Sequence, residues 1–381
     1  MTTHEATSLV DCHVALELSP SKWVIGVLFP GSTKVTTSTV DGGDTALLLR
    51  RLKQAQATAE SRSGVEVRLR MCFESGYDGF WLARLLINHG IDTWVLGPTS
   101  LLVSRRGQRV KTDRIDVEAM VFTLKAYLLG DKGICRPVSI PTPEEEDAKR
   151  VTRERTHVVK ERTRHVNRIR ALLNLHGVRQ VRELWGGQWK DWLGKLVTGD
   201  GRPLGQYLSR DLSRQLERLQ VVLEQVKALE VERKAITAES SCTMPNGEKI
   251  SILRRVSGVG EIGATLLVTE VFYRKFKNRK HLASYLGLSL SPYARGDVSR
   301  DQGISKAGNK RARVLLVELA WCWLRYQPQS RLACWYQVTF AANGGRSRKL
   351  GIVALARKLA IAPWHFVESG IIPEGATLRA A

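Results

Sequence analysis

The sequence predicts an α/β domain, then a helical region, then a mainly α-helical C-terminal domain. In the first 135 residues, short apolar runs typical of strands alternate with helical periodicity. Two long charged stretches carry the apolar spacing of a coiled-coil seam: every seven residues in 144–175, and alternately four and three in 211–238. Beyond residue 249, Gly-rich turns separate shorter helical patterns. We therefore expect three domains: an acidic α/β domain at 1–136, a helical coiled-coil region at 137–245 and a C-terminal domain at 246–381.

The N-terminal domain is expected to open with a β-hairpin. Residues 13–18 and 23–29 are apolar strand candidates on either side of a turn at 19–22. The following elements are predicted in chain order: a helix at 42–59, a strand at 65–73, a helix at 80–89, a strand at 92–96 and a linker at 137–143. An opening hairpin followed by alternating helices and strands favours a sheet of ribonuclease H type over a purely parallel sheet.

The segment KTDRID, residues 111–116, combines two acids with two bases at the start of a helix predicted at 115–128. Asp113 and Asp116 are three residues apart, so a helical turn places both carboxylates on one face. Carboxylates hold magnesium, while Lys111 and Arg114 can neutralise phosphate beside it. A solvated helix start explains the same residues without any ligand.

Two further acids lie at strand positions that suit a shared site. Glu17 lies centrally in the first strand among apolar residues, where a charge is costly unless it faces a cleft or a partner. Glu74 lies where a later strand ends. With Asp113 and Asp116 they could hold two metal ions about 4 Å apart for phosphodiester chemistry. Asp11 is the rival for the first position, but it lies at the mouth of its strand; Glu17 could also be an edge-strand charge.

Composition points to a nucleic-acid partner. Fifty-nine Lys and Arg against thirty-seven Asp and Glu leave a net charge of +22 and a pI near 10.1. The six cysteines are scattered without zinc-like spacing, which favours a reducing compartment. No signal peptide and no apolar run of membrane-spanning length are apparent. We therefore expect a cytoplasmic protein that has no membrane partner and associates with the nucleoid when it acts.

The two long helical stretches suggest a nucleic-acid contact and a packing seam. The first, at 144–175, is strongly basic and has a seam at Val159, Val166 and Leu173, although a solvated charged helix is the alternative. Its expected nucleic-acid contacts are Arg162, Arg164, Arg168 and Arg170. The second, at 211–238, could pack against the first or across a dimer, and we favour the dimer.

The C-terminal region contains a Gly-x-Gly-x-x-Gly pattern that does not follow a Rossmann-type strand. A helix–hairpin–helix turn fits better, with the amides at Gly258 and Gly260 binding a phosphate. We expect helices at 276–286, 310–326 and 346–358 and a polar basic loop at 287–308. Trp321, Trp323 and Trp335 are expected in the core rather than as base-stacking platforms.

Together these pieces resemble the insertion sequence 110 family of transposases, particularly its 1111-like group, over nearly the whole chain. Five segments carry the resemblance: ESGYDGFW at 74–81, KTDRID at 111–116, ERTRHVNRIR at 161–170, GISKAGNK at 303–310 with ELAW at 318–321, and GIVALAR at 351–357. Lys306 and Lys310, within the fourth segment, are expected nucleic-acid contacts.

The resemblance implies an N-terminal RuvC-like domain with four acids, a coiled-coil middle and a C-terminal transposase domain with a nucleophilic serine. It implies Mg²⁺ at Glu17, Glu74, Asp113 and Asp116, with Glu in place of the more usual first Asp. It further implies DNA strand exchange through a phosphoserine intermediate, a non-coding guide (bridge) RNA and a homo-oligomer, dimer or tetramer.

One departure from the family concerns the nucleophile. The family loop commonly reads aromatic-x-Ser-Gly before the GISK segment, whereas this chain has Arg295 at the position of the serine. A guanidinium can bind phosphate but cannot attack it. Three interpretations follow: strand transfer is lost while binding remains, a neighbouring hydroxyl (Ser299, or less favourably Ser305) substitutes, or the sequence of this copy has changed or the alignment is misplaced.

Three functions are therefore weighed. The first is a DNA transposase or recombinase, supported by the acids and basic helices. The second is a catalytically impaired nucleic-acid-binding relative, supported by Arg295. The third is a metal-dependent nuclease resembling a junction resolvase, working from the four acids alone.

Overall fold

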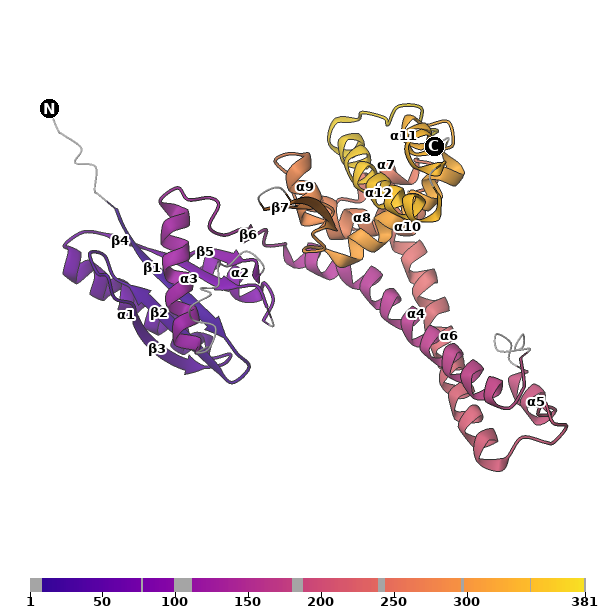
Figure 1. Ribbon diagram of the computed structural model, residues 1–381. Helices are drawn as coiled ribbons and strands as arrows, with labels where there is room; N and C mark the ends of the chain where they lie inside the picture. The colour runs from indigo at the N-terminus through magenta and orange to yellow at the C-terminus, as the bar shows by residue number, and fades with distance from the viewer. Residues whose placement is uncertain are drawn as a thin grey trace. The chain divides into compact units, whose positions relative to one another are not determined.

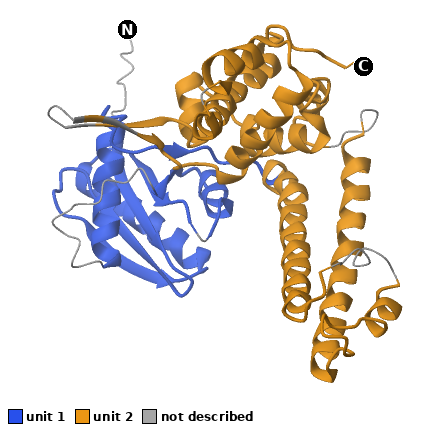
Figure 2. Cartoon of the chain, turned by 45° about the vertical axis from the view of Figure 1, so that its right-hand side comes forward, with its two compact units in different colours: residues 1–143 blue, residues 144–381 orange. Residues whose placement is uncertain are grey.

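The computed structural model describes residues 9–76, 78–98, 112–179, 188–238, 244–295, 298–342 and 344–379. The chain divides into two compact units, Met1–Pro143 and Glu144–Ala381 (Figure 2). The two long central helices belong to the second unit. A separate middle domain ending at residue 245 stays a prediction.

The first unit is built on one six-stranded mixed sheet with the order β3-β2-β1-β4-β5-β6 (Figure 1). Its strands are β1 Val10–Leu18, β2 Lys22–Leu28, β3 Thr36–Asp41, β4 Val67–Glu74, β5 Asp92–Leu96 and β6 Pro137–Val138. The strands β1, β4 and β5 are parallel, whereas β2, β3 and β6 each run antiparallel to their neighbours. The α/β class and the opening hairpin are confirmed.

Helices cover both faces of this sheet. The first unit has α1 Thr45–Ser63, α2 Trp81–Asn88 and α3 Asp113–Leu128. Side chains of α1 and α2 pack with Cys12, Val14 and Leu16 of β1, whereas α3 packs on the other face with Ala15. Every second residue of a strand points to the same face, so β1 separates two cores.

The sequence missed β3 and β6, both at or near an edge of the sheet. β3 reads Thr-Thr-Ser-Thr-Val-Asp and has a single buried residue, Val40, so it lacks an apolar run. β6 has two residues within the segment predicted as a linker. Both strands depend on neighbouring strands for their backbone hydrogen bonds. Neither shows the alternation of apolar and polar residues by which a strand is recognised in a sequence.

The second unit begins with two long helices, α4 Pro143–Leu175 and α6 Gln206–Ile236, which run side by side (Figure 1). They are antiparallel, since Arg155 pairs with Glu230 near one end and Arg168 with Asp211 near the other. With the short α5 Trp189–Gly194 they share one apolar core. Both long helices confirm the sequence prediction.

The seam of the second long helix packs within its own chain, so the favoured dimer seam was wrong. The buried residues of this shared core include Leu212, Leu216 and Leu219 of α6 and Val166, Ile169 and Leu173 of α4. On α4 the buried valine nearer the N-terminus is Val158, and Val159 is half-buried. The apolar stripe of α6 is therefore buried against α4 of the same chain. The sequence pattern revealed the stripe but not the surface that covers it.

The rest of the second unit is mainly helical, as predicted. Its elements are α7 Gly247–Arg254, α8 Gly260–Leu267, η4 Val268–Phe272, α9 Arg279–Tyr285, β7 Leu290–Arg295, β8 Val298–Ile304, α10 Lys310–Tyr326, α11 Arg331–Tyr336, η5 Gln337–Ala341 and α12 Gly344–Ser369. The expected loop at 287–308 was wrong in part, because β7 and β8 form an antiparallel hairpin there.

The helix α12 has the length and apolar composition of a membrane span, although the sequence predicted none. In this structure Leu355, Ala356 and Leu359 of α12 are buried in the core of the second unit. Gly351 of the same helix lies against Phe340, where an added Cβ would come 2.5 Å from the ring. Core helices of globular proteins share the composition of α12, so the match is weak support for a span.

Candidate acidic site and nucleic-acid interface

Two of the predicted acids lie beside each other on the α3 face of the first unit. The register pairs Ala15 of β1 with Cys72 of β4, and both side chains belong to the core beneath α3. Two residues further along each strand come Glu17 and Glu74, which therefore share that face at the carboxyl end of two adjacent parallel strands. Both glutamates are half-buried.

The helix α3 brings the other two acids to the same end. Near its start, Val117 contacts Gly26, which pairs with Ala15; near its end, Lys125 lies close enough to affect His13. The helix thus runs opposite to β1, with its first turn toward the Glu17 end (Figure 1). Asp113 is exposed and Asp116 half-buried in that turn.

Local sequence explains why α3 starts there. Thr112 is the N-cap, and its side chain accepts a hydrogen bond of 3.4 Å from the amide of Ile115. Acids in a first turn also stabilise the helix dipole. Asp113 and Asp116 are therefore suited to the helix start as well as to a ligand. Arg114 forms an exposed pair with Glu118 at 3.1 Å. Lys111 lies outside the described residues.

Asp11 belongs to a different cluster on the same face. It lies six residues before Glu17 in β1, a separation of about 20 Å along an extended strand. Its carboxylate forms ion pairs with Arg68 at 3.0 Å and Arg70 at 3.1 Å. These contacts give Asp11 a structural role and favour Glu17 as the first acid.

The four acids supply oxygen donors of the type that Mg²⁺ prefers. In the described part of the chain, however, no group of three or more His, Cys, Asp or Glu side chains lies close enough to hold a metal ion. The acids thus gather at one end of the sheet without forming a closed ligand cluster. The donor chemistry of the four acids fits magnesium.

Asp78 is an additional acid near this segment. It accepts a hydrogen bond from the indole of Trp23, and partial burial raises its pKa despite that bond. Trp23 packs with Trp81 on the α1 and α2 face, their ring centroids 6.2 Å apart. Asp78 therefore lies against the face opposite the acidic site and anchors the turn after β4.

The basic face predicted on α4 is partly used by internal pairs. Arg164 forms an exposed pair with Glu161 at 3.3 Å, and Arg168 pairs with Asp211 of α6 at 3.3 Å. Arg170 is exposed, and Arg162 is half-buried. These residues remain nucleic-acid contacts only as a prediction.

A buried ion pair, which sequence reasoning missed, fixes α4 to the C-terminal helices. Arg153 donates two hydrogen bonds to Glu270, of 2.8 and 3.1 Å, and Glu270 is 2% exposed. Burial is the largest single effect on the pKa of Glu270 and raises it. The hydrogen bonds and charge of Arg153, with the bond from Asn309 and the charge of Arg311, together hold that pKa below its usual range. The available signal was a single acid inside the apolar run LLVTEVF, residues 266–272.

The GISKAGNK segment has a structural role of its own. Asn309 caps α10 by accepting a bond from the amide of Ala312, and its amide group donates to Glu270 at 3.1 Å. A Cβ on Gly308 would lie 2.3 Å from the carbonyl oxygen of Tyr285. Lys310 is exposed at the start of α10.

Lys306 has an unusual backbone in the same segment. Its φ is 56°, in the left-handed region that few non-glycine residues adopt. Its amide donates to the carbonyl oxygen of Gly287 at 3.1 Å, and the side chain is exposed. The tight packing of this segment thus holds one lysine in a defined place.

The predicted helix–hairpin–helix turn falls between α7 and α8, where Gly258 and Gly260 have positive φ values of 90° and 65°. Within it, the amide of Ser257 already donates to Thr377, and that of Val259 to Val256. Two amides near the proposed phosphate site are therefore used inside the chain. Phosphate binding at the two glycines stays a prediction.

The nucleophile position lies in the β7–β8 hairpin. Arg295 is the last residue of β7 and pairs with Val298 in the register, and the next pair joins Ala294 to Ser299. Ser299 is exposed on β8. Ser305, beyond the hairpin, is also exposed, and its amide donates to Ser289 at 2.8 Å.

The predicted core tryptophans divide into three situations. Trp323 is buried, as expected, and its indole donates to Ser330 at 2.8 Å. Trp321 is 53% exposed on α10, so the core prediction was wrong for it. Trp335 is half-buried at the edge of the C-terminal core and lines a cavity.

Comparison with known proteins shows the family of this chain. Residues 26–177 match a family model of DEDD transposases of IS110 type, which spans Glu74, Asp113 and Asp116 and begins after Glu17. Residues 250–334 match the transposase IS116/IS110/IS902 family.

Full-length relatives extend the similarity. The chain is 41% identical to "Putative transposase y4rJ" of Sinorhizobium fredii over 96% of this chain and 94% of that protein. It is 29% identical to the transposase for insertion sequence element IS1328 of Yersinia enterocolitica, over 71% and 80%. Its identity to the transposase for insertion sequence element IS1111A of Coxiella burnetii is 24%, over 85% and 84%. This chain belongs to the insertion sequence 110 family of transposases.

Proposed function

We propose that this transposase acts on DNA through a divalent-metal site formed by Glu17, Glu74, Asp113 and Asp116, in a first unit of ribonuclease H (RuvC-like) type. The observation that carries the proposal is the placement of these acids. Two lie on adjacent parallel strands, and two lie in the first turn of the helix covering the same face. Asp11, the rival acid, is engaged by Arg68 and Arg70.

Bound magnesium would activate a nucleophile and stabilise charge on the phosphate. The chain's own residues would provide the rest of the site. Glu17 and Glu74 offer carboxylates from a rigid sheet, whereas Asp113 and Asp116 offer them from a helix end. Arg114 is exposed in the same helical turn and is suited to contact a neighbouring phosphate.

The charge of +22 supports DNA and a guide RNA as polyanionic partners in the cytoplasm. The exposed residues Arg164, Arg170 and Lys310 are suited to phosphate contacts. The seam of α6 is used within the chain, so a homo-oligomer, dimer or tetramer, would have to form through other surfaces.

Arg295 favours a second candidate, a relative that binds nucleic acid without completing strand transfer. Arginine has no hydroxyl and keeps its proton, so a covalent protein–DNA link at this position is chemically excluded. Ser299 pairs with the residue next to Arg295 in the hairpin and is the substitute nucleophile that would preserve activity.

The acidic site is tested by a strand-exchange assay with magnesium, the element ends and the associated RNA. We expect Glu17→Gln to abolish exchange while DNA binding persists. The matched change Asp11→Asn removes a carboxylate from the same strand face and should keep exchange. The proposed site would be contradicted if the Glu17→Gln protein still performs strand exchange. It would also be contradicted if Asp11→Asn alone abolishes strand exchange. Metal-dependent cleavage of branched DNA without exchange would indicate a resolvase-like nuclease.

The nucleophile is tested by trapping DNA covalently on denatured protein. If Ser299 substitutes, wild-type protein forms the adduct and Ser299→Ala removes it. If strand transfer has been lost, wild-type protein forms no adduct and Arg295→Ser restores one. Ser305→Ala is the control for the exposed hydroxyl just beyond the hairpin.

A further inference from the structure

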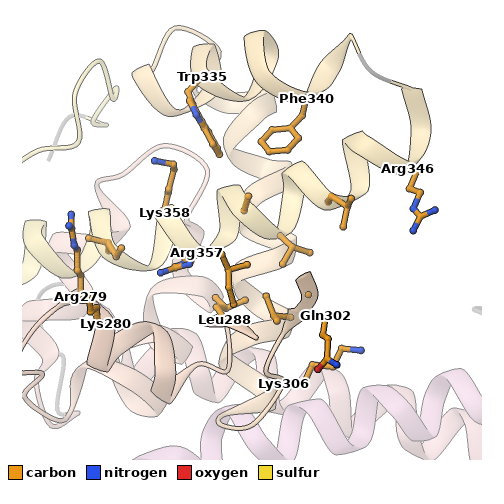
Figure 3. A pocket seen from close by; sticks show the side chains of 17 residues that line it. Arg279, Lys280, Leu288, Gln302, Lys306, Trp335, Phe340, Arg346, Arg357 and Lys358 are labelled. Carbon is orange, nitrogen blue, oxygen red and sulfur yellow. The ribbon is translucent and has the colours of Figure 1, made fainter. Parts of the chain in front are cut away.

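A cavity of about 1050 Å³ lies in the second unit, between the β7–β8 hairpin and the helix α12 (Figure 3). This volume is at the upper end of the roughly 300–1,000 Å³ typical of ligand pockets. Its lining comes from α9, the hairpin, the Trp335–Phe340 segment and α12. The acidic site proposed above lies in the other unit and shares no residue with this cavity.

The charge of the lining is of one sign. No Asp or Glu occurs among the described residues that line the cavity. Six cationic residues do: Arg279, Lys280, Lys306, Arg346, Arg357 and Lys358. A concave surface with several cations and no acid concentrates anions, and it fits several phosphates better than a single carboxylate.

Two aromatic rings give the cavity a second property. Trp335 and Phe340 contact edge to face, with ring centroids 5.4 Å apart, and both are half-buried. The Nζ atom of Lys358 lies 4.6 Å from the Trp335 ring centroid. Figure 3 shows the two rings side by side on one wall, with Gln302 and Lys306 on the opposite side. Aromatic rings among cations are typical of sites that stack bases and bind the attached phosphates.

The shape of the site decides between paired and unpaired nucleotides. Bases within a duplex are stacked on one another, so a side chain inside a cavity reaches a base face only when that base is unpaired. Apolar side chains such as Leu290 and Leu350, which are 56% and 60% exposed, also line the cavity and are suited to contact a base rather than a phosphate.

We propose that this cavity binds an unpaired segment of a polynucleotide strand, with a base stacked on Trp335 or Phe340 and phosphates held by Arg346, Arg357 and Lys280. This inference adds a specific binding site to the proposed function. It rests on that function in one respect, the identification of the bound anion as a nucleic acid. Lys306 is held toward the cavity by its left-handed backbone and the bond to Gly287.

The test measures binding of full-length protein to fluorescein-labelled 12-mers of dT, of rU and of a duplex by anisotropy. We expect Trp335→Leu to weaken single-strand binding about 5- to 150-fold, the effect of losing one base stack, with duplex binding unchanged. The matched control is Trp321→Leu, since Trp321 is exposed in the same unit and does not line the cavity. The stronger of the dT and rU arms identifies the strand as DNA or RNA.

Salt dependence separates the two kinds of contact. Arg357→Gln should lower the slope of log K against log salt by about 0.7 for a single strand, because one phosphate contact is lost. Trp335→Leu should leave the slope unchanged. Arg325→Gln, an exposed change outside the cavity, is the control.

Abasic nucleotides keep the result interpretable if Trp335→Leu perturbs folding. Wild-type protein should bind an abasic 12-mer more weakly than dT, and the variant should not distinguish the two. Equal binding of both by wild-type protein, equal effects of Trp321→Leu and Trp335→Leu, or binding of duplex alone would overturn the proposal. If wild-type protein performs no strand exchange but its single-strand binding still depends on Trp335, the proposed function is refuted and this binding site is retained.

Discussion

Replacing Arg153 by Met should destabilise the second unit and make its stability depend on pH in a new way. Arg153 gives Glu270 two hydrogen bonds, and Glu270 is almost fully buried. The variant leaves that carboxylate with Asn309 as its remaining side-chain donor among the described residues. Removing one partner of a buried pair costs roughly 3–5 kcal/mol. The side chain of Arg153 is 40% exposed, which places the expected loss near 3 kcal/mol.

A second estimate gives the same scale. A carboxylate that is too costly to bury as an anion takes up a proton instead. At pH 7 this costs an ordinary Glu about 3.5 kcal/mol, from the gap between its usual pKa and the pH. The charge penalty in the variant therefore cannot exceed about 3.5 kcal/mol.

The pH dependence follows from the direction of each pKa shift. In wild-type protein the pKa of Glu270 is below its usual range, because Arg153, Asn309 and the charge of Arg311 together outweigh the effect of burial. This stabilisation is therefore complete above the ordinary Glu pKa and is lost only at lower pH. In Arg153→Met, burial raises the pKa of Glu270, so the folded variant gains stability relative to the unfolded chain as pH falls from 7 to 5. The difference between the two proteins should shrink by about 1.4 kcal/mol per pH unit.

Hydrogen exchange of the amides in α8 and α9 measures this difference at pH 7 and pH 5. Arg164→Met is the matched control, because Arg164 lies on the same helix in an exposed pair worth at most about 1 kcal/mol. A loss below about 1 kcal/mol at pH 7 would refute the reasoning. So would a loss that is the same at both pH values.

Two glycine substitutions test close packing. Gly26→Ala places a methyl group 2.1 Å from Val117, so we expect about 1–3 kcal/mol of destabilisation. We also expect strand exchange to be lost, because the methyl group displaces α3 and with it Asp113. Adding Val117→Ala should recover both properties in part. Gly351→Ala places a methyl 2.5 Å from the Phe340 ring; thermal unfolding should show a loss of about 1–3 kcal/mol, and an unchanged Tm would show that η5 can move aside.

Several parts of the fold were predictable because local patterns specify them. The opening hairpin, the strand at 92–96 and the helix at 310–326 match the structure closely, since apolar alternation and helical periodicity report directly on burial. The hairpin at β7–β8 was missed because its residues are polar and its strands are held by each other. Trp321 was misplaced because composition cannot tell which face of the helix α10 is covered.

The sequence by itself determined the family and the basic character, because these depend on residue identity and spacing along the chain. It also supplied the prediction of the four acids. The tertiary structure decided which charges face each other. It paired Asp11 with Arg68 and Arg70, which favours Glu17 as the first acid. It also used Arg153 to neutralise Glu270, 117 residues away, and gathered the cavity cations from separate elements. Contacts between distant segments depend on strand register and helix packing, which no local pattern encodes.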